Sequence, residues 1–584
     1  MMQSTIVNVT ERTTDWNSVN WKSANRVVRR LRQRIFKATK DGDLTRVRNL
    51  QKLLMRSYSN IVLSVRRVTQ LNSGKKTAGV DKLLVLTPTA RGTLVDILTK
   101  FIPWKPLPVK RVYIRKSNAK QRPLSIPCII DRCLQAIVKN ALEPYWEALF
   151  ERTSYGFRPG RGVHDAIERV HSMSKGNSTK SWVVDADIEG CFDNIAHKPL
   201  LETIGNFPAR KLIQQWLKAG YVDKGVFHDT ETGVPQGGII SPLLANIALH
   251  GMESALGIRY NKDGQTLGNR GIVRYADDLV VFCKTQEDAN RAVDELSCFL
   301  KTRGLALSKA KTTIVHLTVG FNFLGFNIRW YQDKNTKTGW KVLIKPSKQS
   351  LQDVRNNIRQ VWLENKSNNV NYLIGKLNPI IRGVANYYRT VVSSHIFSKL
   401  DRWMFVRGKR YAKRMHPNKS TSWHNYRYWG RLNLDRNDYW VFGDKQTGQY
   451  LLKFSWFNIR RHTMVKGDAS PDDPALREYW DLRNNRKSHS LIPSYQKLAQ
   501  KQGYKCSVCG ESLFNDEPLQ KHHKIPRSKG GKDSYANLEL MHYYCHQQLH
   551  SVGQKSEGEV FVLNCQESIP LVGRESEGEV SSLW

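Results

Sequence analysis

The chain has 584 residues, enough for three or four domains at roughly 100–200 residues each. Its 92 Lys and Arg outnumber 51 Asp and Glu, and the formal charge of +41 argues against a generic metabolic enzyme and for a polyanionic partner such as nucleic acid. A hydrophobic content of 40% excludes a wholly disordered basic protein. No apolar run approaches the ~18 residues of a membrane span, and the first residues lack the pattern of a secretory signal, so neither is expected.

The first two thirds of the chain divide into a helical start and a mixed region. Residues 21–70 show a basic helical pattern in which Val27, Val28, Leu31 and Ile35 share one face, and a turn follows at 72–81. Between about 100 and 330, short β-branched runs alternate with helical patterns, which predicts an α+β region containing a sheet. The runs are WVVDADI (182–188), GIVRYADDLVVF (271–282) and TTIVHL (312–317).

The last third begins helical, basic and aromatic. The spacing of Ile381, Ala385, Tyr388 and Val392 predicts a core face, and the opposite face is a candidate RNA surface, with an ordinary solvated face as the alternative. Representative candidates on it are Lys409, Arg410, Lys413 and Arg414. The final residues repeat SEGEV and are acidic, which predicts a disordered tail.

Two pairs of acidic residues lie within or beside apolar strand-like runs. Asp277 and Asp278 fall where a tight turn between two strands would present both carboxylates at the edge of a sheet, although a solvated hairpin turn is the alternative. Asp185 and Asp187 share one face of another strand, with a strand-end charge or a helix cap as the alternative. Two carboxylate-bearing strands in a basic chain favour two-metal phosphoryl transfer, because Mg²⁺ prefers carboxylate oxygens.

Six sequence blocks surround these acids in a fixed order. They are RKSNAKQRPLSIPCIIDRCLQ (115–135), SYGFRPGRGVHDAI (154–167), DADIEGCFDNIAH (185–197), TGVPQGGIISPLLANIAL (232–249), GLALSKAKTTIVHL (304–317) and FNFLGF (321–326). With Tyr275-Ala276-Asp277-Asp278 as the catalytic box, the chain resembles the reverse transcriptases encoded by group II introns, also called maturases, to about residue 550. The resemblance implies a multi-domain α+β protein, with the fingers and palm of a right-hand polymerase and an α-helical thumb.

The resemblance also implies the metal site of the polymerase. The family's aspartates that bind two Mg²⁺ ions fall on Asp187, Asp277 and Asp278. Asp185 and Asp193 are then neighbours of that site rather than ligands.

Other matched positions concern the incoming dNTP and the template. Phe192 stands where the family keeps an aromatic gate against a ribose 2′-hydroxyl, with a core Phe as the alternative. Lys311 matches a lysine near the active site, either a proton donor or a solvated cation, and Arg115 competes with its neighbours for the triphosphate. The residues that the resemblance assigns to nucleotide and template positioning, besides Phe192, are Lys116, Lys120, Arg122, Gln236 and Gly237.

A Cys/His segment near the end of the chain predicts a metal-stabilised module. Cys506-x2-Cys509 and His542-x2-Cys545 form a Cys₃His set that suits structural Zn²⁺. The insertion KHHKIPRSKGGKDSYANLEL (521–540) resembles an HNH endonuclease of the ββα-metal fold.

Within that insertion, the resemblance places the general base at His523 and a loop-holding Asn at Asn537. A structural zinc ribbon with incidental histidines is the alternative. The residues that could hold one catalytic divalent cation, such as Mg²⁺, are His522, His546 and His550.

These interpretations divide the chain into six parts. They are a basic N-terminal extension with the start of the fingers (1–100), fingers and palm (101–335), thumb or maturase domain (336–440), a DNA-binding connector (441–495), the HNH endonuclease (496–552) and an acidic tail (553–584).

The function implied by the resemblance is intron mobility by target-primed reverse transcription. The expected partners are group II intron RNA and double-stranded target DNA, with no membrane and with a monomer or dimer per RNA. The expected location is bacterial, cytoplasmic or nucleoid-associated, and an organellar origin stays open. Two rivals are a splicing factor without polymerase activity and a stand-alone HNH nuclease, and the intact Asp187, Asp277 and Asp278 and palm blocks argue against them.

Overall fold

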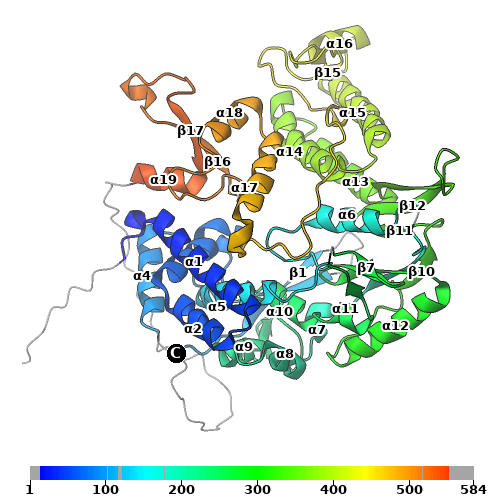
Figure 1. The fold of residues 1–584 in the computed structure, drawn as a ribbon. Helices are drawn as coiled ribbons and strands as arrows, with labels where there is room; N and C mark the ends of the chain where they lie inside the picture. Colours follow the sequence, from blue (N-terminus) through cyan, green and yellow to red (C-terminus); the bar gives the residue numbers. More distant parts are fainter. Residues whose placement is uncertain are drawn as a thin grey trace, which may run out of the picture.

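The computed structural model describes residues 14–101, 103–115, 121–176, 178–262, 264–515 and 517–551. In Figure 1 the N-terminal helices and the C-terminal module, residues 496–551, lie on one side, the palm sheet lies on the other, and the thumb helices rise above the palm. No helix in the described part of the chain is long and apolar enough to cross a membrane. The repeated SEGEV motif lies outside the described residues.

Amphipathic helices open the chain. Val28, Leu31 and Ile35 are buried in the first of them, as predicted, whereas Val27 is 38% exposed, contrary to its predicted place on that face. Successive residues of an α-helix are rotated by about 100° around its axis, so Val27, which precedes Val28, lies outside the buried stripe. The helices of this region are α1 (Trp21–Lys40), α2 (Leu44–Arg56), α3 (Tyr58–Arg66), α4 (Pro88–Thr99) and the long, buried α5 (Ile129–Glu147).

The palm contains a four-stranded antiparallel sheet in the order β10-β3-β9-β8. All three predicted strand-like runs are confirmed in it, and one of them forms a hairpin of two strands. The strands are β3 (Trp182–Asp187), β8 (Gly271–Tyr275), β9 (Asp278–Cys283) and β10 (Thr313–His316). Helix α6 (Val163–Met173) packs on β8, and α12 (Gln286–Lys301) packs on β3 and β9.

A second four-stranded sheet, in the order β2-β1-β4-β5, forms the fingers side. Its strands are β1 (Val109–Arg115), β2 (Gln121–Ile126), β4 (Tyr221–Asp223) and β5 (Val226–His228). Along the chain, short helices and one small hairpin connect the strands of the two sheets. They are α7 (Cys191–Asn194), α8 (His197–Ile204), α9 (Arg210–Leu217), α10 (Ser241–Ala248), α11 (Met252–Ala255), β6 (Arg259–Tyr260) and β7 (Thr266–Leu267).

A three-stranded sheet leads into the thumb. Its strands are β11 (Phe321–Phe323), β12 (Phe326–Gln332) and β13 (Trp340–Pro346), and the thumb helices are α13 (Lys348–Glu364), α14 (Val370–Tyr388), α15 (Ser394–Met415) and α16 (Thr421–Tyr428). Ile381, Ala385 and Tyr388 are buried on α14, as predicted. Val392 is only half-buried, because the helix ends before it.

A connector with little regular structure joins the thumb to the C-terminal module. The connector contains β15 (Val441–Phe442), which pairs with β14 (Trp429–Gly430) at the end of the thumb, and α17 (Arg477–Asn485); α18 (Pro493–Lys501) then leads into the module. The C-terminal module then forms a ββα unit of β16 (Leu519–His523), β17 (Leu538–His542) and α19 (Tyr543–Ser551), with the two strands antiparallel.

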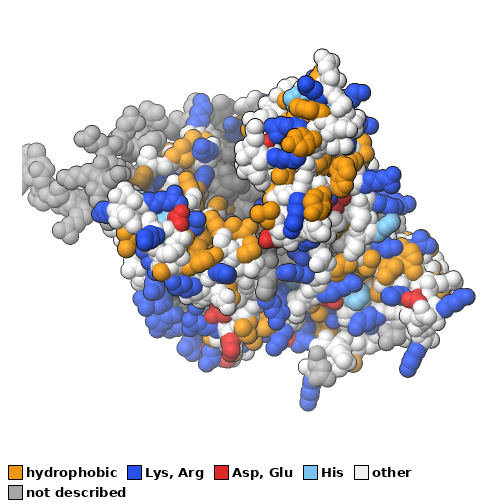
Figure 2. All heavy atoms as spheres, turned by 90° about the horizontal axis from the view of Figure 1, so that it is seen from above, with side chains coloured by type: hydrophobic (Ala, Val, Ile, Leu, Met, Phe, Trp, Pro, Cys, Tyr) orange, Lys and Arg blue, Asp and Glu red, His pale blue; other side chains and the backbone are white. Residues whose placement is uncertain are grey.

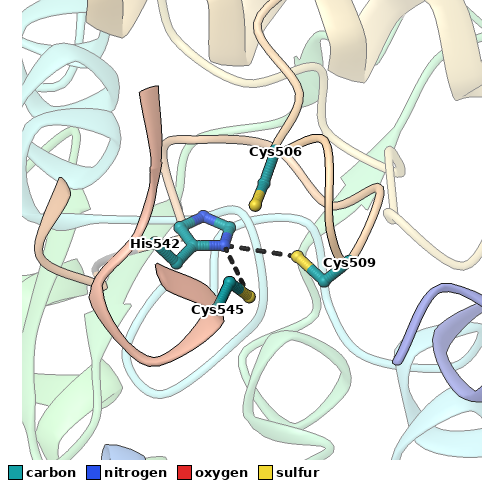
Figure 3. Close-up of side chains that lie close together, drawn as sticks. All are labelled: Cys506, Cys509, His542 and Cys545. Carbon is teal, nitrogen blue, oxygen red and sulfur yellow. Dashed lines mark hydrogen bonds between the residues drawn. The ribbon is translucent and has the colours of Figure 1, made fainter. Parts of the chain in front are cut away.

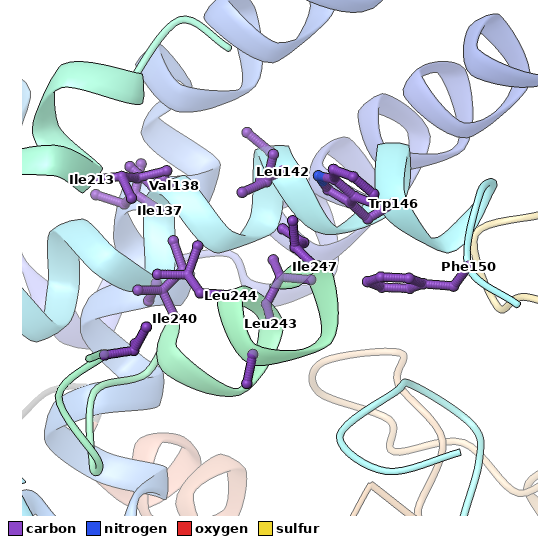
Figure 4. Packing of buried hydrophobic residues seen from close by; sticks show 14 of the residues in the cluster. Ile137, Val138, Leu142, Trp146, Phe150, Ile213, Ile240, Leu243, Leu244 and Ile247 are labelled. Carbon is purple, nitrogen blue, oxygen red and sulfur yellow. The ribbon is translucent and has the colours of Figure 1, made fainter. Parts of the chain in front are cut away.

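Two hydrophobic cores lie on opposite faces of the palm sheet. Val183 and Val280 join a core with α6, the thumb and the connector, whereas Val184 and Leu279 join a core with the N-terminal helices. The strand period of two residues produces this alternation. Figure 4 shows part of the second core, where side chains of α5 such as Leu142 and those of α10 interdigitate. The same core continues into the C-terminal module.

The surface is strongly cationic. Figure 2 shows Lys and Arg side chains over much of the face seen from above, gathered most densely at its lower left, with few acidic side chains among them. This distribution agrees with the net charge of +41 and suits a polyanion.

Candidate functional site

The palm hairpin brings the acidic residues of β3 and β9 together. Asp187 pairs with Asp278 in the antiparallel register, and Asp277 stands in the turn that joins β8 to β9. All three side chains are partly exposed. Neighbouring strands lie about 4.8 Å apart, so the register places the Asp187 and Asp278 carboxylates side by side at one end of the sheet.

The acids at this end of the sheet repel one another. Burial raises the pKa of Asp278 to about 7, and the charges of Asp277 and Asp187 add to the rise. Burial likewise raises the pKa of Asp185 to about 6, with a further contribution from Asp187. The Lys311 ammonium lies 2.5 Å from the Asp187 carboxylate, and this hydrogen bond raises the pKa of Lys311. The site therefore favours cations.

The hairpin turn is held from behind by a buried arginine. Ala276 has a φ of 60°, in the left-handed region that costs a residue with a side chain. Arg274, only 2% exposed, donates from Nη1 to the Ala276 carbonyl at 3.3 Å and to Asn246 Oδ1 at 3.0 Å. Asn246 in turn donates to the Gly156 carbonyl at 2.8 Å. The SYGFRPG segment thus supports the turn that carries Asp277.

Gly156 itself must be a glycine for steric reasons. A Cβ built on it would lie 2.3 Å from the backbone nitrogen of Ala276. The segment and the turn of Asp277 therefore pack backbone against backbone.

A second loop ties the fingers sheet to the palm. Arg122 Nε donates to Gln236 Oε1 at 3.1 Å, and the Ser125 amide donates to the Gln236 carbonyl at 2.6 Å. Gly237 has a φ of 125°, and a Cβ there would lie 2.4 Å from the Ser125 carbonyl oxygen. The structure thus brings three of the predicted positioning residues together, whereas Lys116 and Lys120 lie outside the described residues.

Phe192 lies on the short helix α7 after β3. Its side chain is 8% exposed and meets Phe157 edge to face, with ring centroids 6.1 Å apart. Its carbonyl accepts from the Val234 amide at 2.6 Å. Asp193, its neighbour, faces Arg111 at 4.0 Å. The ring is therefore part of the core, while the backbone carbonyl of Phe192 bonds to Val234, two residues before Gln236.

Four ligand-type side chains converge in the C-terminal module (Figure 3). Cys506, Cys509, His542 and Cys545 are buried, and their donor atoms lie within 4.8 Å of one another. His542 Nδ1 is 3.3 Å from Cys509 Sγ, while Nε2 faces the Ser512 carbonyl at 3.2 Å, which orients the ring. Three sulfurs and one imidazole nitrogen are the donor set of a tetrahedral structural zinc site, so these residues fit that metal.

A second set of histidines in the same module extends from the buried His522 to the exposed His550. His522, His546 and His550 place ring nitrogens within 4.8 Å of one another. Burial, reinforced by the neighbouring histidines, lowers the pKa of His546. Neutral imidazoles are metal ligands, so this set fits one divalent cation. Among the described residues, these two sets of the module are the groups of three or more possible metal ligands whose atoms lie within 4.8 Å of one another.

His523 is the last residue of β16, and Asn537 lies at the end of the loop that leads into β17. His523 Nε2 lies 2.5 Å from Asp533, which also pairs with Arg527. Asn537 accepts from the Ile525 amide at 2.8 Å and donates to the Ile525 carbonyl at 3.0 Å. The amide of Asn537 therefore cross-links the loop, while His523 stays half-exposed at its edge.

Comparisons with known proteins match the chain in the same order. The family models that match are the N-terminal domain of reverse transcriptase (16–98), reverse transcriptase (RNA-dependent DNA polymerase) (114–328), the group II intron maturase-specific domain (351–429) and HNH endonuclease (506–551). Protein YkfC of Escherichia coli is 36% identical over 301 residues, which cover 45% of this chain and 78% of YkfC.

Two further relatives are intron proteins by name. Group II intron-encoded protein LtrA of Lactococcus lactis is 31% identical over 365 residues, covering 50% of this chain and 60% of LtrA. An uncharacterized 91 kDa protein in the cob intron of Schizosaccharomyces pombe is 27% identical over 422 residues, covering 59% of this chain and 51% of that protein.

The chain belongs to the group II intron-encoded proteins. It combines a reverse transcriptase domain with a maturase domain, and it carries an HNH endonuclease domain in residues 506–551. The maturase domain implies binding of intron RNA. The right-hand fold class expected from the family blocks is thus confirmed.

Two supporting residues of this intron protein escaped the sequence analysis. Arg274 lies in an apolar strand. A cation within an apolar run could have indicated that its side chain is buried and hydrogen-bonded. Asp533 pairs with His523 from ten residues away, and nothing in its spacing indicated that contact.

Proposed function

We propose that this intron protein acts in intron mobility by target-primed reverse transcription. It would bind its intron RNA, the ribonucleoprotein would reverse-splice that RNA into one DNA strand, and the HNH domain would nick the other. The 3′-hydroxyl at the nick would then prime cDNA synthesis. The pairing of Asp187 with Asp278 beside the turn of Asp277 carries the polymerase part of this proposal.

Asp187, Asp277 and Asp278 are the proposed ligands of two Mg²⁺ ions. When bound, these ions supply Lewis acidity at the primer hydroxyl and at the leaving pyrophosphate. The protein's own part is to hold the carboxylates on a rigid hairpin and to position the nucleotide. Arg122 of the fingers strand β2 and the Gln236–Gly237 loop bonded to that strand are proposed for the latter role, together with Phe192.

The polymerase proposal is tested with purified protein, a primed RNA template, dNTPs and Mg²⁺. Asp277→Asn should lower cDNA synthesis by at least about a thousand-fold, because it removes a metal ligand, while affinity for the intron RNA stays within about two-fold. Asp294→Asn, an exposed change on α12, is the matched control and should leave both unchanged. Full cDNA synthesis by Asp277→Asn would contradict the assignment.

His523 is the proposed general base of the nuclease, able to take a proton from the attacking water. The nearby Asp533 carboxylate accepts from the imidazole and fixes its ring. His522, His546 and His550 are the proposed ligands of the catalytic cation, which supplies charge stabilisation at the leaving oxygen. The four buried Cys and His ligands would hold Zn²⁺ as a structural ion.

The nuclease proposal predicts a separation of two steps. His523→Ala should abolish nicking of the second DNA strand while reverse splicing continues, since the latter is RNA chemistry. Gln547→Ala, exposed on α19, is the control and should nick normally. Continued nicking by His523→Ala would move the general base to another residue.

The partners follow from the same domains. Intron RNA is the proposed ligand of the thumb, where Lys409, Arg410, Lys413 and Arg414 lie on α15, and the connector and HNH domain would contact double-stranded DNA. A cytoplasmic or nucleoid-associated location in a bacterium is proposed, with an organellar origin as the alternative; the bacterial source of LtrA supports only the bacterial part.

A further inference from the structure

The nuclease module is built onto the N-terminal helices of the polymerase. Its buried Leu513, Leu540 and Met541 belong to the same hydrophobic core as Trp16 and Trp21. Polar contacts frame this core at its edges. Gln548 Nε2 donates to the carbonyls of Asn17 at 2.7 Å and Val19 at 3.1 Å, Lys75 contacts Tyr544, and Arg29 pairs with Glu511.

One buried cation lies at the centre of this interface. Arg66, the last residue of α3, is 4% exposed. Its Nη2 lies 3.3 Å from the sulfur of Cys545 and 3.4 Å from Glu517 Oε2, both in the nuclease module. Its guanidinium stacks over the Trp21 ring at 4.5 Å from the centroid, while its Nε makes no hydrogen bond. The polar partners of the Arg66 guanidinium are thus a cysteine of the zinc-type cluster and a neighbouring glutamate, both in the nuclease module and neither in its own domain.

The charge of the cluster explains why a cation belongs there. Three cysteine thiolates and a neutral imidazole around Zn²⁺ carry a net negative charge. Burying that charge is costly unless a cation is nearby, and a buried guanidinium has the same need for an anion. A hydrogen bond from a charged donor also stabilises a metal-bound ligand, as partners outside the ligand set commonly do.

We infer that Arg66 is the counter-cation of the zinc–thiolate cluster and that metal loading of this cluster docks the nuclease module onto the N-terminal helices of the polymerase. The inference rests on the proposed zinc assignment, but not on either catalytic activity. The metal would then do more than fold a small module. It would set the position of the nuclease relative to the polymerase that extends its nick.

A competing explanation is that Arg66 serves only Glu517. That carboxylate also accepts from Asn515 Nδ2 at 2.8 Å and lies 4.0 Å from His542 Nδ1. The two explanations differ in the effect of Glu517→Gln. If the Cys545 thiolate is the principal partner of Arg66, Glu517→Gln should leave the rate of Zn²⁺ release unchanged. If Glu517 is the principal partner, Glu517→Gln should speed Zn²⁺ release as much as Arg66→Gln does.

The experiment uses the full chain loaded with Zn²⁺. Release of the metal to a chromogenic chelator is timed, and hydrogen exchange is followed in α3 (Tyr58–Arg66) and α19 (Tyr543–Ser551). Arg66→Gln should release Zn²⁺ at least about ten-fold faster, a loss of about 1.4 kcal/mol, and Arg66→Lys should fall between. Arg67→Gln, the exposed neighbour of the same residue type, is the matched control and should match the unaltered protein.

The unaltered protein supplies a second, independent measurement. Removing its Zn²⁺ should increase exchange in α3 as well as in α19, because both helices contribute to the docked interface. Unchanged α3 exchange after metal removal, or metal release by Arg66→Gln as slow as by Arg67→Gln, would overturn the inference. cDNA synthesis on a primed RNA, measured on each preparation, reports whether the polymerase is folded and so separates this outcome from a failure of the proposed function.

Discussion

At the scale of single residues, protonation of Asp278 in the proposed polymerase site makes the stability of the folded protein depend on pH. Its pKa is raised to about 7 by burial and by neighbouring acids, whereas an unfolded Asp titrates near pH 4. The folded protein therefore holds a proton that the unfolded chain releases in this interval. The stability contributed by that proton is complete below about pH 4 and is lost as the pH rises through about 7.

The first prediction follows from this proton. In buffer without Mg²⁺, Asp278→Asn should stabilise the protein at pH 8 by roughly 1–3 kcal/mol, because the neutral amide replaces a repelled carboxylate. The gain should shrink at pH 5, where Asp278 is already protonated. Denaturant unfolding at the two pH values measures it, with Asp294→Asn as the control. An equal gain at both would show that Asp278 is not the titrating group.

The roles of some residues could be predicted from the sequence, and those of others could not. Asp185, Asp187, Asp277 and Asp278 stood out because their carboxylates lie within or beside apolar strand-like runs, although a hairpin turn or a strand end would also explain them. The family resemblance then singled out Asp187, Asp277 and Asp278 among them. The ring of Phe192 is buried in the core, while its backbone carbonyl bonds to Val234 close to the Gln236 loop, so sequence alone could not separate a gate from a core residue. Arg66 gave no signal, since helices α1 to α3 carry many arginines and its burial depends on a module far along the chain.

At the scale of elements, strand β2 and the Gln236–Gly237 loop form one unit. The contact is backbone to backbone, between Ser125 and both residues of the loop. No side chain at position 237 fits between them. This contact fixes the distance between the fingers strand and the palm.

The second prediction tests that unit. Gly237→Ala should destabilise the protein by roughly 2–4 kcal/mol, because the new Cβ adds a clash with Ser125 to an unfavourable φ, and cDNA synthesis should fall at least about ten-fold as the loop shifts. Gly225→Ala is the control, since it also has a positive φ of 91° but open space around it. Equal effects of the two changes on thermal stability and on polymerisation would refute the steric explanation.

Element types were largely predictable, and element ends were not. The palm strands followed from β-branched runs, since these pack well on both faces of a buried sheet. Val392 was assigned to the α14 face because its spacing continues the helical period, yet the helix ends at Tyr388. Periodicity gives the direction of a side chain only while the helix lasts.

At the scale of the whole molecule, the connector is clamped to the palm by buried charges. Asp165, at the start of α6, accepts from the Val465 amide at 2.8 Å and faces His462 at 2.8 Å and Arg483 at 2.6 Å. Asp472 similarly pairs with Arg32 of α1 at 2.7 Å. The connector therefore bridges palm and N-terminal helices before it reaches the nuclease.

The third prediction concerns this clamp. Asp165→Asn leaves Arg483 without its charged partner, a change that costs about 3–5 kcal/mol in buried pairs, so hydrogen exchange around Val465 should accelerate at least about a hundred-fold. Asp468→Asn is the control, because its pair with Arg152 is half-exposed and such surface pairs contribute little. Similar exchange in both variants would show that the clamp is not what holds the connector.

Arrangements at this scale were beyond sequence reasoning. The blocks indicated which domains occur and in what order, but the contact between Gln548 and Asn17 joins the two ends of the described chain. Pairings across that separation depend on shape and burial rather than on a local pattern. The separate domains were therefore predicted, and their docking was not.

The core shared by the nuclease module and the N-terminal helices has a consequence for the history of such proteins. A chain that lost residues 496–551 would present Trp21 and its apolar neighbours to water, together with an arginine deprived of its anion. Such a chain would be prone to self-association until polar substitutions resurfaced α1 and α3. Deletion of this nuclease is thus expected to be deleterious on its own. A related protein without the nuclease should carry polar residues on the face of α1 and α3 that the nuclease covers here.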